Sequence, residues 1–315
     1  PLRDAAARYG DTRRAFLDAA GSLKSARVSA PAPIRARCLG EAFCVREFLL
    51  QSSAGFIAAD PSLQDLYLRS DTPLSQEGAD TLLKAGGTAQ SDTYFGAFSL
   101  HFWAQKTHLD TARLALEIKS GRGTLTLCHA DAAGERALAA PLPFDTQKPV
   151  VLTLPFSVTT LKSGLVFWRL TAESDVLIGP ARYVTDEAPQ RPVRLGAVIT
   201  TFRREAAARG AMARFAASGL ADEGHRLLVV DNGESLEETP PAGVRLLPNR
   251  NLGGAGGFSR GLMELNHAGD VTHVLFMDDD ASTPVDCLHK TIALLAFARE
   301  EHLAVCGAMF LEEVH

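Results

Sequence analysis

Three consecutive aspartates, Asp278, Asp279 and Asp280, are the residues of this sequence best suited to chemistry. They follow the apolar run 274–277, which predicts a buried β-strand. Adjacent carboxylates repel each other, and a hard divalent cation such as Mg²⁺ or Mn²⁺ would relieve that repulsion. Because side chains alternate along an extended chain, we predict that Asp278 and Asp280 hold the metal and that Asp279 faces a sugar or ribose. A solvated acidic turn that caps the next helix is the alternative.

A glycine-rich segment, residues 249–261 (NRNLGGAGGFSRG), is a candidate phosphate-binding loop. Glycines before a helix let a ligand approach the backbone and expose amides at the helix N-terminus. The segment matches neither the GxGxxG pattern nor the Gly-Lys-Ser/Thr ending of a P-loop. Arg204 and Arg260 are candidate phosphate partners because a guanidinium is a fixed cation with forked donors. The alternative is a tight loop that packs the helix onto a sheet.

Polar clusters also follow two other predicted strands, 195–201 and 227–230. Their candidate ligand-binding residues are Thr200, Thr201, Phe202, Arg204, Asp231 and Asn232. Asp231 could accept hydrogen bonds from a base or ribose and Asn232 could both donate and accept, although Asp-Asn-Gly is also a common turn sequence. Since the carboxyl ends of parallel strands share one edge of a sheet, these clusters and the aspartates are expected to line one cleft.

The C-terminal part of the chain alternates between strand and helix patterns, which predicts an α/β domain with a parallel sheet over residues 193–315. Further strands are expected at 244–247, 273–277 and 303–310, and helices at 204–218 and 259–267. Another helix is expected after Thr283, which can cap it, with Asp286 completing a capping box. Its apolar stripe would contain Val285, Leu288, Ile292 and Leu295.

Residues 63–187 read differently, as an all-β, jelly-roll-like sandwich. Short strands are expected at 94–103, 114–119, 124–127, 150–154 and 165–170, with turns at 120–123 and 133–134. The aromatic group Tyr94, Phe95, Phe98, Phe102 and Trp103 is expected to form sandwich core, and stacking against sugar rings is the alternative. Before the sandwich, residues 1–62 are expected to be a helical extension, with helices at 11–24 and 41–50. Residues 186–192 are expected to be a linker.

Composition excludes several classes of protein. The net charge of −5 argues against a general nucleic-acid binder. No uncharged apolar run approaches the roughly 20 residues of a membrane span. The five cysteines are scattered and contain no CxxC, which favours a reducing cytoplasm over a disulfide framework or zinc cluster. The sequence also has no H-x-x-H arrangement.

The segments ITTFRR, VVDNG, NRNLGGAGGFSRG and VLFMDDDAS, in this order, resemble the bacterial galactofuranosyltransferases. Those are inverting, metal-dependent enzymes of glycosyltransferase family 2 with a GT-A nucleotide-sugar domain. Residues 66–68 and 93–98 resemble the N-terminal β-sandwich of the polymerising members, so a sandwich followed by a GT-A domain is the expected architecture. The resemblance implies a UDP-galactofuranose donor, Mn²⁺ or Mg²⁺ as cofactor, and a glycan or polyprenyl-linked glycan acceptor in cell-wall or polysaccharide biosynthesis.

The resemblance also implies roles for individual residues. Nucleotide contacts fall on Thr201, Phe202, Arg204, Asp231, Asn232 and Asn251, and the metal diphosphate falls on Asp278 and Asp280, with Asp279 beside the donor sugar. Thr200 and Gly254 join the expected nucleotide-sugar site from their positions in the same segments. Arg203 stands where the family often has Asn. No residue matches the family's catalytic base, which is expected beyond His315, so the GT-A domain is expected to be incomplete at its C-terminal end.

The family further implies a cytoplasmic enzyme, peripheral on the inner face of the plasma membrane, that can form homo-oligomers. Two alternatives to this function remain. One is a non-catalytic carbohydrate-binding or scaffold protein built on the sandwich. The other is a transferase for another sugar or a nucleotidyltransferase, since a fold by itself does not determine the chemistry.

Overall fold

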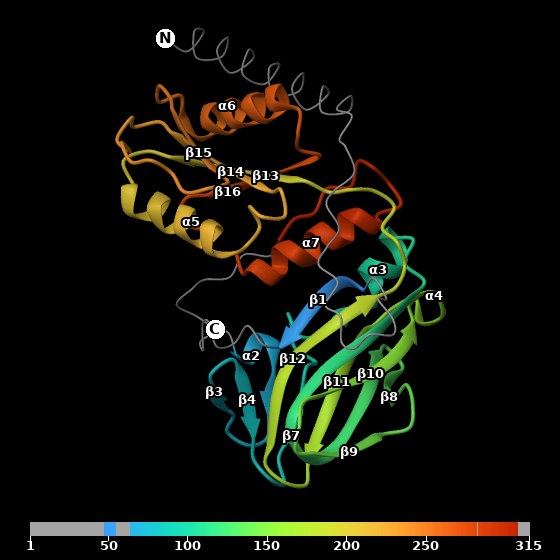
Figure 1. Ribbon diagram of the computed structural model, residues 1–315. Helices are drawn as coiled ribbons and strands as arrows, with labels where there is room; N and C mark the ends of the chain where they lie inside the picture. The colour runs from blue at the N-terminus through green and yellow to red at the C-terminus, as the bar shows by residue number, and fades with distance from the viewer. Residues whose placement is uncertain (1–46, 55–63, 282, 308–315) are drawn as a thin grey trace, which may run out of the picture. The chain divides into compact units, whose positions relative to one another are not determined.

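The computed structural model describes residues 47–54, 64–281 and 283–307. These residues form two compact units (Figure 1). The first, the α/β unit, comprises residues 191–285. The second, the sandwich unit, comprises the described residues from 47 to 190 together with 286–307. The predicted helix at 11–24 lies outside the described residues.

The α/β unit is built on a four-stranded parallel sheet with the order β15-β14-β13-β16. Its strands are β13 (Leu195–Thr201), β14 (Arg226–Asp231), β15 (Val244–Pro248) and β16 (His273–Asp278), and its helices are α5 (Glu205–Ala217) and α6 (Gly253–Ala268). The two helices cover opposite faces of the sheet (Figure 1). Because both faces are covered, the central strands are almost continuously apolar.

Alternation along β13 divides its side chains between the two helices. Ala197 and Ile199 pack with Ala208 and Met212 of α5. The intervening Val198 packs on the opposite face, in the cluster that contains Leu265 of α6. Residues 195–201 therefore form the strand that their β-branched residues predict. The strand is packed between two apolar layers, one on each face of the sheet.

The sandwich unit contains twelve strands in one strongly curled antiparallel sheet. Its strands are β1 (Phe48–Ala54), β2 (Arg69–Ser70), β3 (Ser75–Glu77), β4 (Asp80–Leu83), β5 (Thr88–Gln90), β6 (Phe98–Ser99), β7 (Thr111–Asp131), β8 (Gly134–Ala137), β9 (Leu142–Thr146), β10 (Val150–Ser157), β11 (Leu165–Ala172) and β12 (Val176–Thr185). Its helices are α2 (Gln64–Tyr67), α3 (Leu100–Lys106), α4 (Val158–Leu161) and α7 (Val285–Phe297). The prediction of an all-β unit is confirmed in this coarse sense.

The long strand β7 joins the two layers of the sandwich. Its first half pairs with β10 and β12, and its second half pairs with β11, β8 and β9. The turn predicted at residues 120–123 is wrong, because these residues continue the strand. Gly121 has φ +117°, and a Cβ on Gly123 would lie 2.4 Å from the Thr171 carbonyl oxygen. The glycines therefore let β7 bend between layers where a side chain would clash.

The residues of the aromatic group differ in burial. The rings of Phe98 and Trp103 are fully buried and stacked, with centroids 5.2 Å apart, whereas Tyr94 and Phe102 are 57% and 56% exposed. The predicted strand 94–103 is wrong over most of its length, since it contains the short strand β6 and then α3. Phe98 and Trp103, five residues apart, would lie on opposite faces of a single strand, yet both are buried because a helix begins between them, so period-two reasoning failed here.

Three other elements differ from prediction. Residues 48–50, expected in a helix, lie in β1, which pairs with β12 and extends the sheet to residues before the expected start of the sandwich at 63. Residues 303–307, expected to begin a strand, contain none. Helix α7 belongs to the sandwich unit, although the sequence placed it in the α/β domain.

Helix α7 is attached to the sandwich by buried polar and aromatic contacts. Asp286 does not complete a capping box. It is 5% exposed and its Oδ2 accepts a hydrogen bond of 2.5 Å from the Tyr67 hydroxyl. The ring of Phe297 packs edge-on against Phe48, with centroids 5.1 Å apart, and its carbonyl accepts from the His108 amide. The side chain of Asp286 therefore links α7 to Tyr67 at the end of α2, 219 residues away in the sequence.

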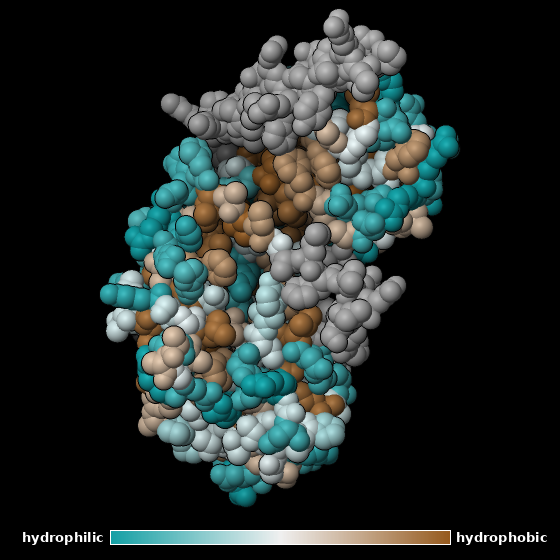
Figure 2. Space-filling model, turned by 180° about the vertical axis from the view of Figure 1, so that it is seen from behind, coloured by the Kyte–Doolittle hydropathy of each residue, from teal (hydrophilic) through white to brown (hydrophobic). Residues whose placement is uncertain are grey.

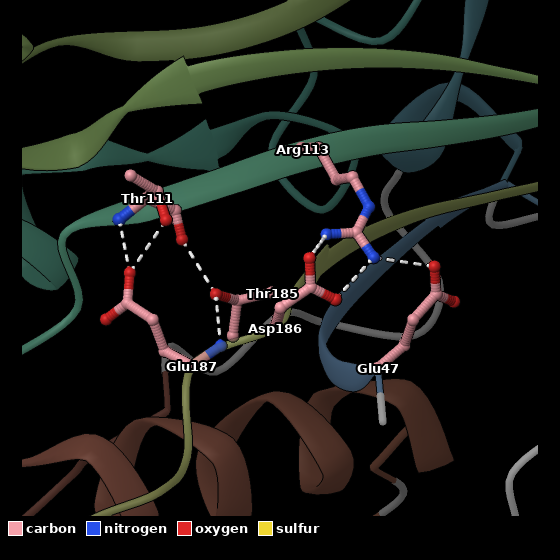
Figure 3. A network of polar contacts seen from close by, with 6 residues as sticks. All are labelled: Glu47, Thr111, Arg113, Thr185, Asp186 and Glu187. Atoms are coloured by element: carbon pink, nitrogen blue, oxygen red, sulfur yellow. Dashed lines mark hydrogen bonds and ion pairs between the residues drawn. The ribbon is translucent and has the colours of Figure 1, made fainter. Parts of the chain in front are cut away.

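The first two residues of the predicted linker, Asp186 and Glu187, take part in a network of polar contacts (Figure 3). Arg113 donates to both carboxylate oxygens of Asp186, at 2.5 and 2.8 Å, and to Glu47 at 2.7 Å. Glu187 accepts from the amide and hydroxyl of Thr111, at 2.6 and 2.8 Å. Bidentate pairing of this kind fixes geometry as well as charge, so residues 186 and 187 act as the last residues of the sandwich.

The lower part of Figure 2, formed by the sandwich, carries mostly hydrophilic and intermediate residues, with scattered apolar residues among them. This agrees with an apolar core enclosed between the two layers of the curled sheet. Among the helices that the structure describes, none has both the length and the apolar character needed to cross a membrane.

Candidate functional site

The predicted site residues gather at the carboxyl edge of the four-stranded sheet, within the α/β unit. Thr201 is paired with Asp231 on β14, and Thr200 is paired with Asp278 on β16. The parallel register therefore brings the three predicted clusters to one edge. This is the position where open α/β sheets bind ligands.

Asp279 is the buried member of the aspartate triplet. Its Oδ2 accepts a hydrogen bond of 2.7 Å from the Thr201 hydroxyl, and its Oδ1 accepts one of 3.0 Å from Nη1 of Arg204. The residue is only 5% exposed. We expected Asp279 to face a sugar, but both of its oxygens are bonded within the protein. The reason is that the carboxylate lies between β13 and the start of α5, where a buried charge needs partners.

Asp278 and Asp280 are both exposed, on either side of Asp279. Arg204 Nη1 also donates to Oδ2 of Asp280, at 3.0 Å, so one guanidinium bridges two of the three aspartates. This bond, and the charge behind it, lower the pKa of Asp280 below its ordinary value. The three acids therefore form an edge that already holds one positive charge.

Asp231 organises the loop after β14. It is 1% exposed, and its carboxylate accepts from the backbone amides of Gly233, Ser235 and Leu236 at 2.9, 2.7 and 2.8 Å. An aspartate that satisfies three turn amides is a local loop-forming device. The structure thus gives Asp231 a positioning role, where the sequence suggested direct contact with a base or ribose.

Asn232 ties three segments together beneath the edge. Its Nδ2 donates to Thr200 Oγ1 at 3.1 Å and to the Gly253 carbonyl at 3.3 Å. Its Oδ1 accepts from Nδ2 of Asn249 at 2.7 Å. Asn249 was missed as a site residue, although an Asn-x-Asn sequence just before the glycines was the available signal. These amides set the position of α6 relative to β13.

The glycine-rich segment is mostly helix, not loop. Helix α6 begins at Gly253, six residues before the predicted start at Ser259. A Cβ on Gly257 would lie 1.9 Å from Thr200 Oγ1, and one on Gly261 would lie 2.3 Å from Val198 Cγ1. These glycines, one helical turn apart, let α6 pack closely on β13. The alternative interpretation expected such packing, but from a tight loop and not from within the helix.

The first glycines of the segment are open to solvent. Gly253 has φ +74°, and a Cβ on Gly254 would meet nothing within 4 Å. Asn251, also exposed, accepts from the Gly253 amide at 3.0 Å. Arg260 is engaged with Glu264 on the same helix, at 2.9 Å, so it is not grouped with the edge residues. The open N-terminus of α6 presents amides to any anion that reaches this edge.

Phe202 and Arg203 form the exposed rim after β13. The ring of Phe202 is 44% exposed, and the Arg203 guanidinium lies 5.1 Å from its centroid. Arg203 has φ +54°, a left-handed backbone conformation that is uncommon for a residue with a side chain. An exposed aromatic face beside a cation is suited to stacking with a planar ligand group.

The site therefore has a buried tier and an exposed tier. The buried tier is Thr201, Asp231, Asn232 and Asp279, and the exposed tier is Phe202, Arg204, Asn251, Gly254, Asp278 and Asp280. Within the described part of the chain, no group of three or more His, Cys, Asp or Glu side chains is arranged to hold a metal ion. A cation bound here would take its remaining ligands from the substrate. These groups are suited to an anionic ligand that carries a planar ring, bound together with a cation.

A cavity of about 510 Å³ lies at the opposite edge of the same sheet, where the strands begin. Two of its arginines are paired with acids that also line it, Arg226 with Asp270 and Arg245 with Glu264. The cavity is therefore separate from the polar residues at the carboxyl ends of the strands.

Comparison with known proteins places the chain near one class of enzyme, the glycosyltransferases. Its relatives include galactofuranosyltransferase GlfT2 of Mycolicibacterium smegmatis, 28% identical over 271 residues, and galactofuranosyltransferase GlfT2 of Mycobacterium tuberculosis, 27% identical over 271 residues. Each alignment covers 80% of this chain and 42% of the relative, so the chain spans about two fifths of the length of these relatives. No family model matches the chain.

Two solved structures with low similarity to this chain contain modules named CBM22-1. One contains the CBM22-1 and GH10 modules of Clostridium thermocellum xylanase Xyn10B in complex with xylohexaose. It has a TM-score of 0.28 and 10% identity, over 60% of this chain and 38% of that one. Another is the CBM22-1 xylan-binding domain of Paenibacillus barcinonensis Xyn10C, with a TM-score of 0.27 and 13% identity over 45% and 94% of the two chains.

Proposed function

We propose that this chain is the donor-binding part of a glycosyltransferase of cell-wall polysaccharide synthesis, with a GT-A type nucleotide-sugar site at the carboxyl edge of the four-stranded sheet. The donor is UDP-galactofuranose, and the acceptor is a glycan or lipid-linked glycan. The similarity to two galactofuranosyltransferases supports the class of reaction. The observation that carries the site is the pair of exposed carboxylates, Asp278 and Asp280, at the carboxyl edge of the sheet, where Asn232 also links Thr200 to the start of α6.

The residues present fit a hard divalent cation. Asp278 and Asp280 offer exposed carboxylates, and Asp280 already accepts a bond from the positively charged Arg204 guanidinium. Two carboxylates with substrate phosphates are a usual ligand set for Mg²⁺ in proteins. When bound, Mn²⁺ or Mg²⁺ would neutralise charge on the diphosphate of the leaving group.

The protein's own residues would orient the donor. Thr201 and Arg204 hold Asp279 in place, which positions the acids on either side of it. Gly254, at the exposed start of α6, would offer its amide to a diphosphate, and the exposed ring of Phe202 would stack with uracil. Transfer with inversion also requires a base that deprotonates the acceptor hydroxyl, and we assign that role to no residue of this chain.

The test is calorimetric titration of the chain with UDP, with and without Mn²⁺, using Asp280→Ala as the variant. We expect metal-dependent binding that weakens about tenfold or more in the variant, a change of about 1.4 kcal/mol. Asp222→Ala removes an exposed acid from another loop of the same unit and is expected to bind as the wild type does. The proposal is overturned if the affinity for UDP is the same with and without Mn²⁺ and is unchanged in Asp280→Ala.

The choice of donor is tested separately. Competition by UDP-galactofuranose, UDP-galactopyranose and UDP-glucose against bound UDP, with Mn²⁺ present, should rank the furanose first. If the other sugars compete equally well, the site is a UDP site without the proposed sugar preference.

A further inference from the structure

A row of polar side chains crosses the outer surface of the sandwich. Arg69 on β2 is paired with Gln90 on β5, Gln90 with Arg169 on β11, and Arg169 with Thr126 on β7. Residues directly opposite each other in adjacent strands point to the same face of a sheet. At a strand spacing of about 4.8 Å, the row is about 14 Å long, enough to contact more than one sugar ring.

This row lies on the solvent side of the sheet. Trp168, the neighbour of Arg169 in β11, points inward and is fully buried, whereas the side chain of Arg169 is 33% exposed. The Arg169 guanidinium lies 5.8 Å from the centroid of Phe167, whose ring it covers. Arg69, at the other end, is 58% exposed.

The groups in the row are held in fixed orientations by one another. Arg169 donates to Gln90 Oε1 at 3.0 Å and pairs with Glu135 of β8 at 2.8 Å. Arg69 Nε donates to Asp92 Oδ1 at 2.7 Å. The charges of the two guanidiniums and the two carboxylates in these pairs cancel. Preorganised groups lose little conformational entropy when a ligand binds.

An exposed aromatic ring lies close in sequence to Asp92, the partner of Arg69. Tyr94 follows Asp92 by two residues and is 57% exposed. Its ring contacts Phe95, whose ring lies 5.1 Å from that of Tyr67 and whose amide donates to the Leu66 carbonyl. These contacts place Tyr94 beside the segment that leads into β2.

We propose that this surface, which we call the polar row (Arg69, Gln90, Thr126 and Arg169 with Asp92, Glu135 and Tyr94), binds a neutral glycan chain. Sugar hydroxyls both donate and accept hydrogen bonds, and the polar row carries guanidinium donors together with amide, hydroxyl and carboxylate groups that can accept. An aromatic face suits the apolar face of a sugar ring. The absence of net charge on these residues disfavours a polyanion, whose binding depends on a field of one sign.

The experiment measures glycan binding by the whole chain without nucleotide or metal. Native affinity electrophoresis in gels with soluble galactan, arabinogalactan or xylan shows binding as retarded migration, and a dilution series of polysaccharide yields the dissociation constant. We expect the wild type to be retarded by at least one of these polymers. Arg169→Ala and Tyr94→Ala should each weaken that binding about tenfold or more.

Two matched variants control for general surface effects. Lys84→Ala breaks an exposed ion pair with Asp175, of 2.9 Å, elsewhere on the sandwich. Phe102→Ala removes an aromatic ring as exposed as Tyr94, on α3. Both should bind as the wild type does. Thermal unfolding verifies that each variant is folded, and Arg69→Ala, at a 58% exposed side chain, replaces Arg169→Ala if the latter does not fold.

The proposal is overturned if none of the three polymers retards the wild type, or if the controls weaken binding as much as the polar-row variants do. The inference does not rest on the proposed transferase function. UDP titration reports only on the carboxyl edge of the α/β unit, so failure of either experiment leaves the other result interpretable.

Discussion

The Thr201 hydroxyl donates to Asp279 Oδ2 across 2.7 Å, joining the end of β13 to the turn after β16 although 78 residues separate them. The bond explains why three adjacent acids can be tolerated. The middle one is buried and neutralised by Arg204, and its neighbours remain in solvent. Asp279 is thus a positioning group for the two exposed carboxylates.

Replacing Asp279 by Ala should destabilise the protein. The change leaves the Thr201 hydroxyl and one Arg204 bond without an acceptor, at a cost of about 1–3 kcal/mol in the free energy of unfolding. Urea denaturation followed by circular dichroism measures this. Asp278→Ala, at an exposed carboxylate, should change stability by less than about 0.5 kcal/mol. Equal stability of both variants would show that the buried bonds contribute nothing.

Gly257 should not tolerate even one added methyl group. The new Cβ would lie 1.9 Å from Thr200 Oγ1, so α6 would be forced away from β13. We expect Gly257→Ala to cost about 1–3 kcal/mol of stability, as overpacked sites do.

The matched control is Gly254→Ala, where a Cβ meets nothing within 4 Å. Alanine there is expected to leave stability unchanged or raise it by up to about 1 kcal/mol, because it is the better helix former. Thermal and urea unfolding of both variants compare the two sites directly. If Gly257→Ala is as stable as Gly254→Ala, Gly257 is not needed for the close packing of α6 on β13.

The pH dependence of stability should carry a contribution from Asp286. Burial raises the pKa of this carboxyl, although the bond from Tyr67 opposes the shift. The folded state therefore binds the proton more tightly than the unfolded chain. The resulting stabilisation is complete below the unfolded-state pKa and is lost as the pH rises through the folded-state pKa.

Asp286→Asn removes this titration and keeps an acceptor for Tyr67. We expect the stability of the variant, relative to wild type, to increase from about pH 4 to about pH 7 in urea unfolding. Asp175, whose pKa is lowered by its bond to Lys84, is the control of opposite sign. Its Asn variant should lose stability relative to wild type over the same interval. A flat difference for Asp286→Asn would contradict the burial effect.

The thiols should differ sharply in reactivity. Cys306 is exposed, Cys128 is buried, and burial raises the pKa of the Cys287 thiol to about 12. In a background with Ser at Cys38 and Cys44, maleimide should modify Cys306 at least about a hundredfold faster than the other two. Peptide mapping by mass spectrometry resolves the three rates. In urea all three should react alike, and rapid native labelling of Cys287 would be the contrary result.

Local patterns in the sequence predicted much of the α/β unit. The strands ending at Thr201, Asp231 and Asp278 lie where the apolar runs placed them, and their parallel pairing brings the polar clusters to one edge. Periodicity failed in the aromatic segment, where Trp103 is buried from a helix, because strand and helix both explain a short aromatic run. It failed again at Gly121, where a turn signal marks a bend within β7.

The sequence by itself determined which residue types could carry chemistry and on which strand ends they lie, since strand patterns and carboxyl-edge clustering follow from local periodicity. Only the tertiary structure decided what each residue does. Asp279 is buried against Thr201 and Asp286 against Tyr67, because partners 78 and 219 residues away come into contact only on folding. Burial of a charge depends on those distant partners, and no local pattern records them.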